Sequence, residues 1–272
     1  MKKFVFIPLL LAVCSLFAGE KIRMHAHRGE PSLAPQNTVE SIKLAFDLGA
    51  LMIETDCWLA KDGSMVICHD RGELKKYWGI DKQPSELTDE EIKNAKLACA
   101  DKFDKKYADC KLPTLDDILA VIPKDKAFEL EIKHYGDGCA DKVEAARIKA
   151  GLDYSNILIT SFRDDVIRDF KKKYPKYETL FIVWVGKDAK PEPIIERAKN
   201  AGASQVAIGG YRNINADFVA KIKAAGLKVG VWQVENLDDL AFAAMLGVDR
   251  VCSNYASRLR RDFETVKSLD FK

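Results

Sequence analysis

Three short stretches place acidic, basic and histidine side chains where buried strands would otherwise be apolar. The first is His27-Arg28-Gly29, at the end of the run IRMHAH. Two side chains that can carry positive charge, followed by a glycine, suit the binding of an anion. Charged groups at the end of a buried strand are costly unless an ion or a ligand compensates them. The pattern therefore predicts a site that meets an anionic substrate.

The second stretch is IETDCWLAKDGSMVICHD, residues 53 to 70, in which Asp62-Gly63 separates two apolar runs. Asp-Gly in this setting is a strong signal for a two-residue hairpin turn. With that turn, Asp56 faces His69 across the hairpin, and Glu54 shares the face of Asp56 because side chains alternate along a strand. Two carboxylates and a histidine then converge. Carboxylates suit one hard divalent cation, such as Mg²⁺ or Ca²⁺.

The third stretch is AFELEIKH, residues 127 to 134, where Glu129, Glu131 and Lys133 share one strand face. We expect Glu131 to be the third metal ligand and Lys133 to lie at the C-terminal strand end. Glu129 and His25 are expected one layer deeper. Seven residues then converge at neighbouring strand ends: His27, Arg28, Glu54, Asp56, His69, Glu131 and Lys133. This set fits metal-assisted cleavage of a phosphodiester, with one histidine as base and the other as acid.

The elements that position these residues alternate between strands and helices from residue 20 onward. Strands are predicted at residues 22–27, 51–59, 65–69, 127–133, 156–161, 180–185, 205–209, 228–234 and 250–253. Helices are predicted at residues 39–48, 141–150, 164–173, 193–201, 216–225 and 237–246. About eight such units over this length predict an α/β fold, a (β/α)₈ TIM barrel, formed as one domain by residues 20–272. A doubly wound open sheet is the alternative.

Residues 71–113 interrupt this alternation and are rich in lysine, aspartate and glutamate. We interpret them as a small insertion that follows the hairpin of the second barrel strand, with one short helix at residues 88–95. An insertion at such a strand end is expected to shape the substrate entrance.

The N-terminus has the features of a secretory signal peptide at residues 1–18. Lys2 and Lys3 precede an apolar run, and Ala18 is a small residue suited to cleavage. The run is short for a membrane span. We therefore expect a periplasmic or secreted protein with no stable membrane insertion after cleavage. A lipoprotein cleavage site at Cys14 is an alternative that Val13 disfavours.

Charge and cysteine content exclude other classes. The 43 basic and 41 acidic residues of the 272 are intermixed, without a basic run interleaved with aromatic residues, which argues against nucleic-acid binding. Six cysteines follow the predicted signal peptide. The sequence contains no CxxC pair, which argues against a structural zinc site. In the predicted hairpin Cys57 lies directly opposite Cys68. For this pair, two packed free thiols are favoured over a disulfide. Cys99 and Cys110 are the other candidate pair.

The motifs HRG, PQNT, IETD, KDG, HD, EIK, SF and VWQVEN, taken in this order, resemble the glycerophosphodiester phosphodiesterase family. The resemblance covers residues 23 to 258. It implies a barrel of the phospholipase C-like phosphodiesterase type that hydrolyses glycerophosphodiesters to glycerol 3-phosphate and an alcohol. The glycerol 2-hydroxyl would attack phosphorus, and water would open the cyclic product.

Carried over residue by residue, the resemblance makes His27 and His69 the acid–base pair. It makes Arg28 and Lys133 phosphate contacts and places Trp232 near the glycerol. The ligands of Mg²⁺ or Ca²⁺ would be Glu54, Asp56 and Glu131.

The sequence departs from the family motifs at several positions. PENT is usual where this chain has Gln36, and TDxP is usual where it has Ser253-Asn254-Tyr255-Ala256. WTVN is usual where this chain has Gln233 and Glu235. No ligand or histidine is lost, so the departures bear on the alcohol side of the substrate and on the first loop.

Two other functions compete with this one. A phospholipase D of the sphingomyelinase type would use the same histidines and acidic residues. It would need access to lipid, and residues 71–113 contain no amphipathic membrane-binding stretch. An inactive barrel that binds a phosphorylated ligand is the other alternative, which the intact set of histidines and carboxylates argues against.

Overall fold

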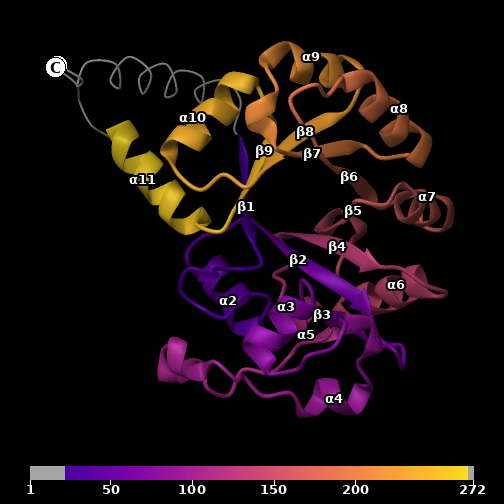
Figure 1. Cartoon of the computed structure of the whole chain (residues 1–272), viewed down its shortest axis with the longest axis vertical. Helices are drawn as coiled ribbons and strands as arrows, with labels where there is room; N and C mark the ends of the chain where they lie inside the picture. Colours follow the sequence, from indigo (N-terminus) through magenta and orange to yellow (C-terminus); the bar gives the residue numbers. More distant parts are fainter. Residues whose placement is uncertain (1–21, 269–272) are drawn as a thin grey trace.

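The computed structural model describes residues 22–268, in which eight parallel strands form a closed barrel (Figure 1). The barrel closes where the first strand pairs with the second. Closure confirms the predicted (β/α)₈ barrel, because an open sheet would leave two unpaired edges. The barrel strands are β1 (Arg23–His27), β2 (Met52–Leu59), β4 (Ala127–His134), β5 (Ile157–Ser161), β6 (Glu178–Trp184), β7 (Gln205–Gly209), β8 (Lys228–Trp232) and β9 (Arg250–Ser253).

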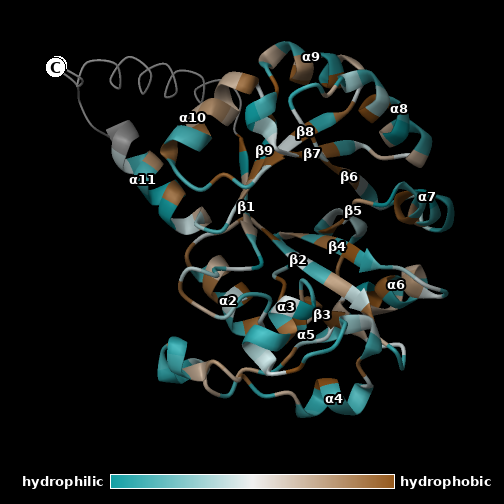
Figure 2. Cartoon of the chain, viewed as in Figure 1, coloured by the Kyte–Doolittle hydropathy of each residue, from teal (hydrophilic) through white to brown (hydrophobic). Residues whose placement is uncertain are grey.

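Helices surround the barrel and bury their apolar faces against its outer surface. Figure 2 shows brown apolar residues along the strands and a mixture of brown and teal on the helices. None of the described helices is long and apolar enough to cross a membrane. The helices are α2 (Val39–Asp47), α5 (Leu115–Leu119), α6 (Cys139–Ala150), α7 (Asp164–Lys173), α8 (Pro191–Ala201), α9 (Ala216–Ala224), α10 (Leu237–Leu246) and α11 (Ala256–Ser268). The sequence patterns did not predict α5 or α11.

Strand β3 (Met65–Ile67) lies outside the barrel and pairs antiparallel with the second half of β2. The predicted two-residue turn is wrong. Ala60 donates its N–H to the carbonyl of Ser64 at 2.9 Å, so the loop is the three residues Lys61-Asp62-Gly63. Gly63 has φ 99°, which suits the left-handed position of a three-residue hairpin loop.

The extra loop residue shifts every pair of the hairpin by one. Cys57 pairs with Ile67 rather than with Cys68, and Cys68 donates its N–H to the carbonyl of Asp56. A shift of one residue exchanges the two faces of a strand. Cys57 therefore packs under the helices, whereas Cys68 packs with the segment after the hairpin. The geometric basis for a Cys57–Cys68 disulfide is lost, and all six cysteines in the described chain are free thiols.

Residues 71–113 pack a small apolar cluster of their own against the β2–β3 hairpin. The predicted helix at residues 88–95 is α4, which is one residue shorter at each end and is capped reciprocally by Thr88 and Glu91. In Figure 1, α4 lies at the bottom, beyond α3 and α5. The other short elements are α3 (Arg71–Glu73), η1 (Leu74–Trp78), η2 (Pro84–Glu86), η3 (Ala100–Lys102) and η4 (Lys105–Tyr107).

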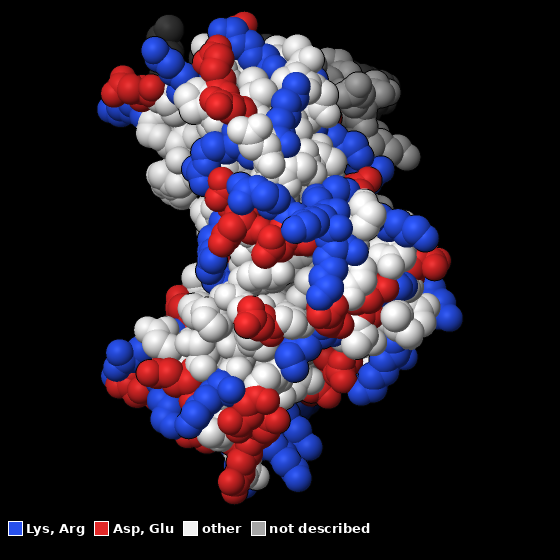
Figure 3. Space-filling model, turned by 90° about the vertical axis from the view of Figure 1, so that its right-hand side faces the viewer, with Lys and Arg blue, Asp and Glu red and all other residues white. Residues whose placement is uncertain are grey.

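The surface in Figure 3, which is the right-hand side of Figure 1, carries both signs of charge interspersed. This agrees with the intermixed charges of the sequence. The predicted signal peptide and the lipidation site at Cys14 lie outside the described residues.

Candidate active site

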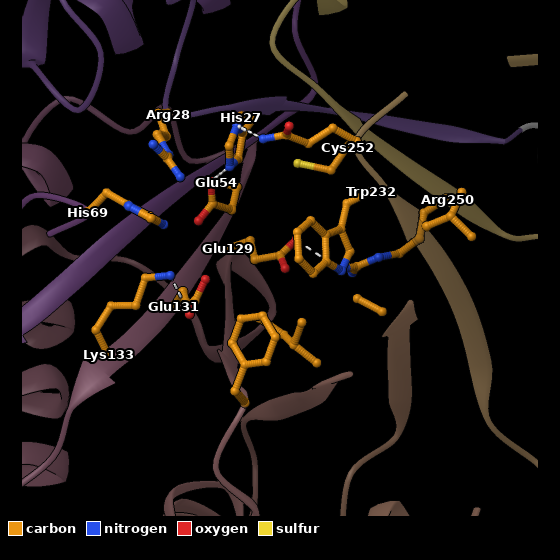
Figure 4. A pocket seen from close by; sticks show the side chains of 15 residues that line it. His27, Arg28, Glu54, His69, Glu129, Glu131, Lys133, Trp232, Arg250 and Cys252 are labelled. Carbon is orange, nitrogen blue, oxygen red and sulfur yellow. Dashed lines mark hydrogen bonds and ion pairs between the residues drawn. The ribbon is translucent and has the colours of Figure 1, made fainter. Parts of the chain in front are cut away.

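A pocket opens at the C-terminal ends of the barrel strands, and side chains from around the barrel line it (Figure 4). This is the end of a TIM barrel at which active sites lie. The pocket contains seven of the eight predicted site residues, and the eighth, Asp56, is fully buried just beneath it. Its lining includes His27, Arg28, Glu54, His69, Glu131, Lys133, Phe162 and Trp232.

Three carboxylates meet in this pocket because of strand register. Asp56 on β2 lies beside Glu131 on β4, and Glu54 lies two residues earlier on the same face of β2. Each offers an oxygen, and these oxygens lie within 4.8 Å of one another. All three side chains are buried, and Glu54 Oε2 accepts no hydrogen bond in the structure. Three buried carboxylates with an unpartnered oxygen fit a hard divalent cation.

Two cations neutralise only part of this charge. Arg28 Nε lies 3.0 Å from Asp56 Oδ2, and Lys133 Nζ lies 3.2 Å from Asp56 Oδ1 and 2.7 Å from Glu131 Oε1. Burial would raise the pKa of Asp56, but Lys133 and Arg28 outweigh burial and lower it. The pKa of Glu131 is raised to about 7 by burial, against the opposing effect of Lys133. Burial and Asp56 also raise the pKa of Glu54. A cation bound here would offset the excess negative charge.

The loop after β1 adopts a backbone that explains the glycine of the HRG motif. Arg28 and Asn37 have left-handed φ angles of 59° and 56°, and Gly29 has φ 87°. A Cβ on Gly29 would lie 2.5 Å from Ser41 Oγ and 2.8 Å from its carbonyl carbon, so no side chain fits. This turn places the Arg28 guanidinium against Asp56. Asn37 Nδ2 donates to the same carboxylate at 3.2 Å.

His27 lies between the acidic group and a polar amide. Its Nε2 is 3.7 Å from Glu54 Oε2, and its Nδ1 is 2.6 Å from Asn254 Oδ1 (Figure 4 shows the contact with Glu54). Burial, and then Arg28, lowers the pKa of His27 to about 4. The imidazole is therefore neutral near pH 7, as a general base must be.

His69 is more exposed and has a carboxylate partner. Its Nδ1 lies 2.6 Å from Asp70 Oδ2, and its side chain is 32% exposed. Burial lowers its pKa, the charge of Asp56 and the hydrogen bond with Asp70 oppose that shift, and the cations nearby add to it. Because β3 ends at Ile67, strand alternation does not direct His69 towards the pocket. The bend that follows does so, and Glu73 Oε2 accepts the His69 backbone N–H at 3.1 Å.

Glu73 is a buried residue of the site that the sequence did not reveal. Its carboxylate accepts hydrogen bonds from Gln36 Nε2 at 2.6 Å and from Asn37 Nδ2 at 3.0 Å, as well as from His69. Burial and Asp56 raise its pKa to about 7. It ties the loop after β1 to the loop after β3. Its position in a charged segment gave no periodic signal by which to find it.

Aromatic rings form one wall of the pocket. Phe162 and Trp232 line the pocket and meet edge to face with centroids 5.8 Å apart, and Trp184 contacts Trp232 from outside this lining, with centroids 5.6 Å apart. Lys133 Nζ lies 5.7 Å from the centre of Phe162. This places Trp232 opposite the acidic group, where it can contact the carbon atoms of a bound ligand.

A polar layer forms the floor of the pocket. His25 Nδ1 and Arg250 Nη2 lie 2.7 Å and 2.9 Å from Glu129 Oε2, and Arg250 Nη1 donates to Gln205 at 3.1 Å. His25 and Glu129 thus lie one layer below the site, bound to each other. No sequence pattern indicated that Arg250 completes this layer.

Comparisons with known proteins agree with this geometry. The model of the glycerophosphoryl diester phosphodiesterase family matches residues 27–257. A glycerophosphodiester phosphodiesterase of Caldanaerobacter subterraneus subsp. tengcongensis is 31% identical over 233 residues, which are 84% of this chain and 92% of that protein. A putative glycerophosphodiester phosphodiesterase of Bacillus subtilis is 26% identical, over 87% of this chain and 96% of that one.

Solved structures extend the comparison. An Oleispira antarctica phosphodiesterase in complex with the product sn-glycerol 3-phosphate is similar at a TM-score of 0.74 and 25% identity, covering 92% of this chain and 99% of that one. A putative glycerophosphoryl diester phosphodiesterase from Silicibacter pomeroyi matches at a TM-score of 0.76 and 19% identity, covering 92% and 95%. The chain belongs to the glycerophosphoryl diester phosphodiesterase family and is a phosphoric diester hydrolase.

Proposed function

We propose that this chain hydrolyses glycerophosphodiesters to sn-glycerol 3-phosphate and an alcohol, with His27 and His69 as the proton-transferring pair. The observation that carries the proposal is the group of three buried carboxylates, flanked by two histidines at one end of the barrel. The product complex of the Oleispira antarctica relative supports the same chemistry.

We propose Glu54, Asp56 and Glu131 as the ligands of one Mg²⁺ or Ca²⁺ ion. When bound, such an ion neutralises charge on the phosphoryl oxygens and polarises the P–O bonds. Arg28 and Lys133 lie on the same side of the pocket, where they can contact the non-bridging oxygens of the diester.

The two histidines divide the proton transfers between them. Neutral His27 accepts the proton of the glycerol 2-hydroxyl as this oxygen attacks phosphorus. His69, whose imidazolium form the adjacent Asp70 carboxylate stabilises, donates a proton to the departing alcohol oxygen. In the second half, His69 takes a proton from the attacking water, and His27 returns its proton to the 2-oxygen. Each histidine then has its original protonation state.

The test is release of sn-glycerol 3-phosphate from glycerophosphocholine and glycerophosphoethanolamine, with Ca²⁺, Mg²⁺ or chelator. We expect metal-dependent release that His69→Ala and Glu131→Gln lower by ~10²-fold or more. Glu192→Gln is a matched control, because this exposed carboxylate lies on α8, and it should retain full activity. No release with either ion would refute the proposal. Preference for sphingomyelin or lysophosphatidylcholine would favour the lipid-cleaving alternative instead.

We also propose export, with residues 1–18 removed and residues 20–272 forming one barrel domain in which residues 71–113 border the entrance. The support is Lys2 and Lys3 before an apolar run that ends at Ala18. Mass spectrometry of the protein recovered from its native host tests the cleavage. A mature N-terminus at Cys14 with a lipid adduct would favour the lipoprotein alternative.

A further inference from the structure

A chain of hydrogen bonds runs from His27 away from the pocket to a second carboxylate. His27 Nδ1 lies 2.6 Å from Asn254 Oδ1, although the two residues are 227 positions apart in the sequence. Asn254 Nδ2 donates to Glu235 Oε1 at 3.1 Å, and the Asn254 backbone N–H points to the same oxygen at 3.5 Å. The activity proposed above uses neither Asn254 nor Glu235.

The carboxylate determines which way the Asn254 amide points. An ionised carboxylate can only accept hydrogen bonds, so the NH₂ group of Asn254 must face Glu235. The amide oxygen then faces His27, and an oxygen acceptor requires the proton on His27 Nδ1. The other ring nitrogen, Nε2, therefore carries the lone pair. Nε2 is the atom that lies in the pocket, 3.7 Å from Glu54.

A second amide contacts the same nitrogen of His27 and could favour the other tautomer. Gln233 Nε2 lies 3.1 Å from the same His27 Nδ1, and as a donor it would require the opposite tautomer. Among the described residues, no other side-chain hydrogen bond of Gln233 is present, so turning its amide over breaks no further hydrogen bond. The amide of Asn254 cannot turn over, because its oxygen would then oppose the Glu235 carboxylate.

Glu235 is itself fixed in place. Its backbone N–H points to Asp239 Oδ2 at 3.3 Å, and Arg258 Nη2 donates to its carbonyl at 3.0 Å. Position 235 has a carboxylate and position 254 an amide, so one acceptor and one donor are in contact.

We propose that Glu235 is a positioning residue that acts through Asn254 to hold His27 in the tautomer with the proton on Nδ1. The proposal rests on the proposed function, since it assigns a reason for His27 Nε2 to be the base. Loss of the carboxylate frees both amides to turn over, and the base is then present in only part of the molecules. General base catalysis is worth ~10²–10⁴-fold, so partial loss should lower kcat by ~10–100-fold.

The first experiment compares wild type, Glu235→Leu and the control Glu192→Gln in kcat, KM and histidine ¹⁵N spectra. Ring ¹⁵N resonances distinguish a protonated from an unprotonated nitrogen, and His27→Asn identifies the signal of His27. We expect Nδ1–H in the wild type, mixed tautomers in Glu235→Leu, and a kcat loss with KM changed less than about threefold. Wild-type spectra showing Nε2–H, or an unchanged kcat and tautomer in Glu235→Leu, would overturn the proposal. Glu235→Ala replaces Glu235→Leu if the latter does not fold.

The second experiment supplies the acceptor directly. A carboxylate at position 254 can only accept a hydrogen bond, so Asn254→Asp should hold the proton on His27 Nδ1 whichever residue stands at 235. Added to Glu235→Leu, it should recover kcat at least ~10-fold and restore the Nδ1–H signal, because a loss of packing would not be reversed by a second substitution. A double variant no better than Glu235→Leu would contradict the proposal. If the wild type releases no glycerol 3-phosphate, the proposed function fails, but the spectra still decide the tautomer.

Discussion

Replacing Arg250 by methionine should destabilise the fold by leaving a buried carboxylate without its cation. Arg250 Nη2 lies 2.9 Å from Glu129 Oε2, and both side chains are less than a tenth exposed. Burial alone would raise the pKa of Glu129, but Arg250 and His25 outweigh burial and hold it at about 2. In the variant His25 remains as the partner of Glu129 on the pocket floor.

The size of the expected stability loss follows from the burial of the Arg250–Glu129 ion pair. Removing one partner of a buried ion pair costs ~3–5 kcal/mol, since the other charge remains buried. In a domain of this size each kcal/mol lowers Tm by ~2–4 °C, which gives a decrease of ~6–20 °C. The double variant Arg250→Met with Glu129→Gln should recover most of this loss, because a neutral amide oxygen still accepts from His25.

The loss of stability in Arg250→Met should depend on pH in a defined direction. In the wild type the pKa of Glu129 lies below its unfolded value, so the pair stabilises the fold above about pH 4.5, and the effect disappears as the pH falls towards 2. Without Arg250, burial raises that pKa above the unfolded value. The ionised carboxylate then destabilises the fold at pH 7, and protonation relieves this as the pH falls. The difference between variant and wild type should therefore shrink from pH 7 to pH 5.

Urea unfolding at pH 7 and pH 5 measures this difference as a free energy of unfolding. Lys172→Met is the control for loss of a cation, because Lys172 is exposed on α7 and its removal should change stability by less than ~0.5 kcal/mol. A loss below 1 kcal/mol for Arg250→Met at pH 7, or an equal loss at both pH values, would refute the reasoning.

Two further predictions concern the metal site and the aromatic wall. Ca²⁺ or Mg²⁺ at 100 times its Kd should stabilise the wild type by ~2.7 kcal/mol, or ~5–11 °C in a thermal shift assay. At the same ion concentration Glu131→Gln should show a clearly smaller shift, and an equal shift in both proteins would argue against this residue as a ligand. Gly209→Ala should raise KM several-fold, because its Cβ would lie 2.5 Å from Trp184 and 2.6 Å from Trp232, which must move. Steady-state kinetics test this, and an unchanged KM would show that the wall does not contact the substrate.

The class of fold and most of the pocket lining could be predicted from local patterns. Strand alternation has a period of two residues, so Glu54 and Asp56 share a face wherever the strand begins. The same holds for Glu129, Glu131 and Lys133. Observed strand ends lie within two residues of the predicted ones, because β-branched runs and flanking glycines mark them locally. The register between β2 and β4, which places Asp56 beside Glu131, follows once those strands are neighbours in a barrel.

Other parts of the site depend on contacts that no local pattern specifies. The number of loop residues in the hairpin decides which residues pair, and Asp62-Gly63 is compatible with loops of two or three residues. The buried position of Glu73 results from the folding of the short helices after His69 against the first loop.

The sequence by itself therefore determined the barrel, the strand faces and the types of groups at the strand ends, because these follow from periodicity and motif spacing over a few residues. Closure of the barrel decided which of these groups contact one another. It brings β9 against β1, so that Asn254 reaches His27, and it brings Arg250 across the interior to Glu129. Contacts over such separations depend on the stagger of all eight strands, which is a property of the closed sheet and not of any one segment.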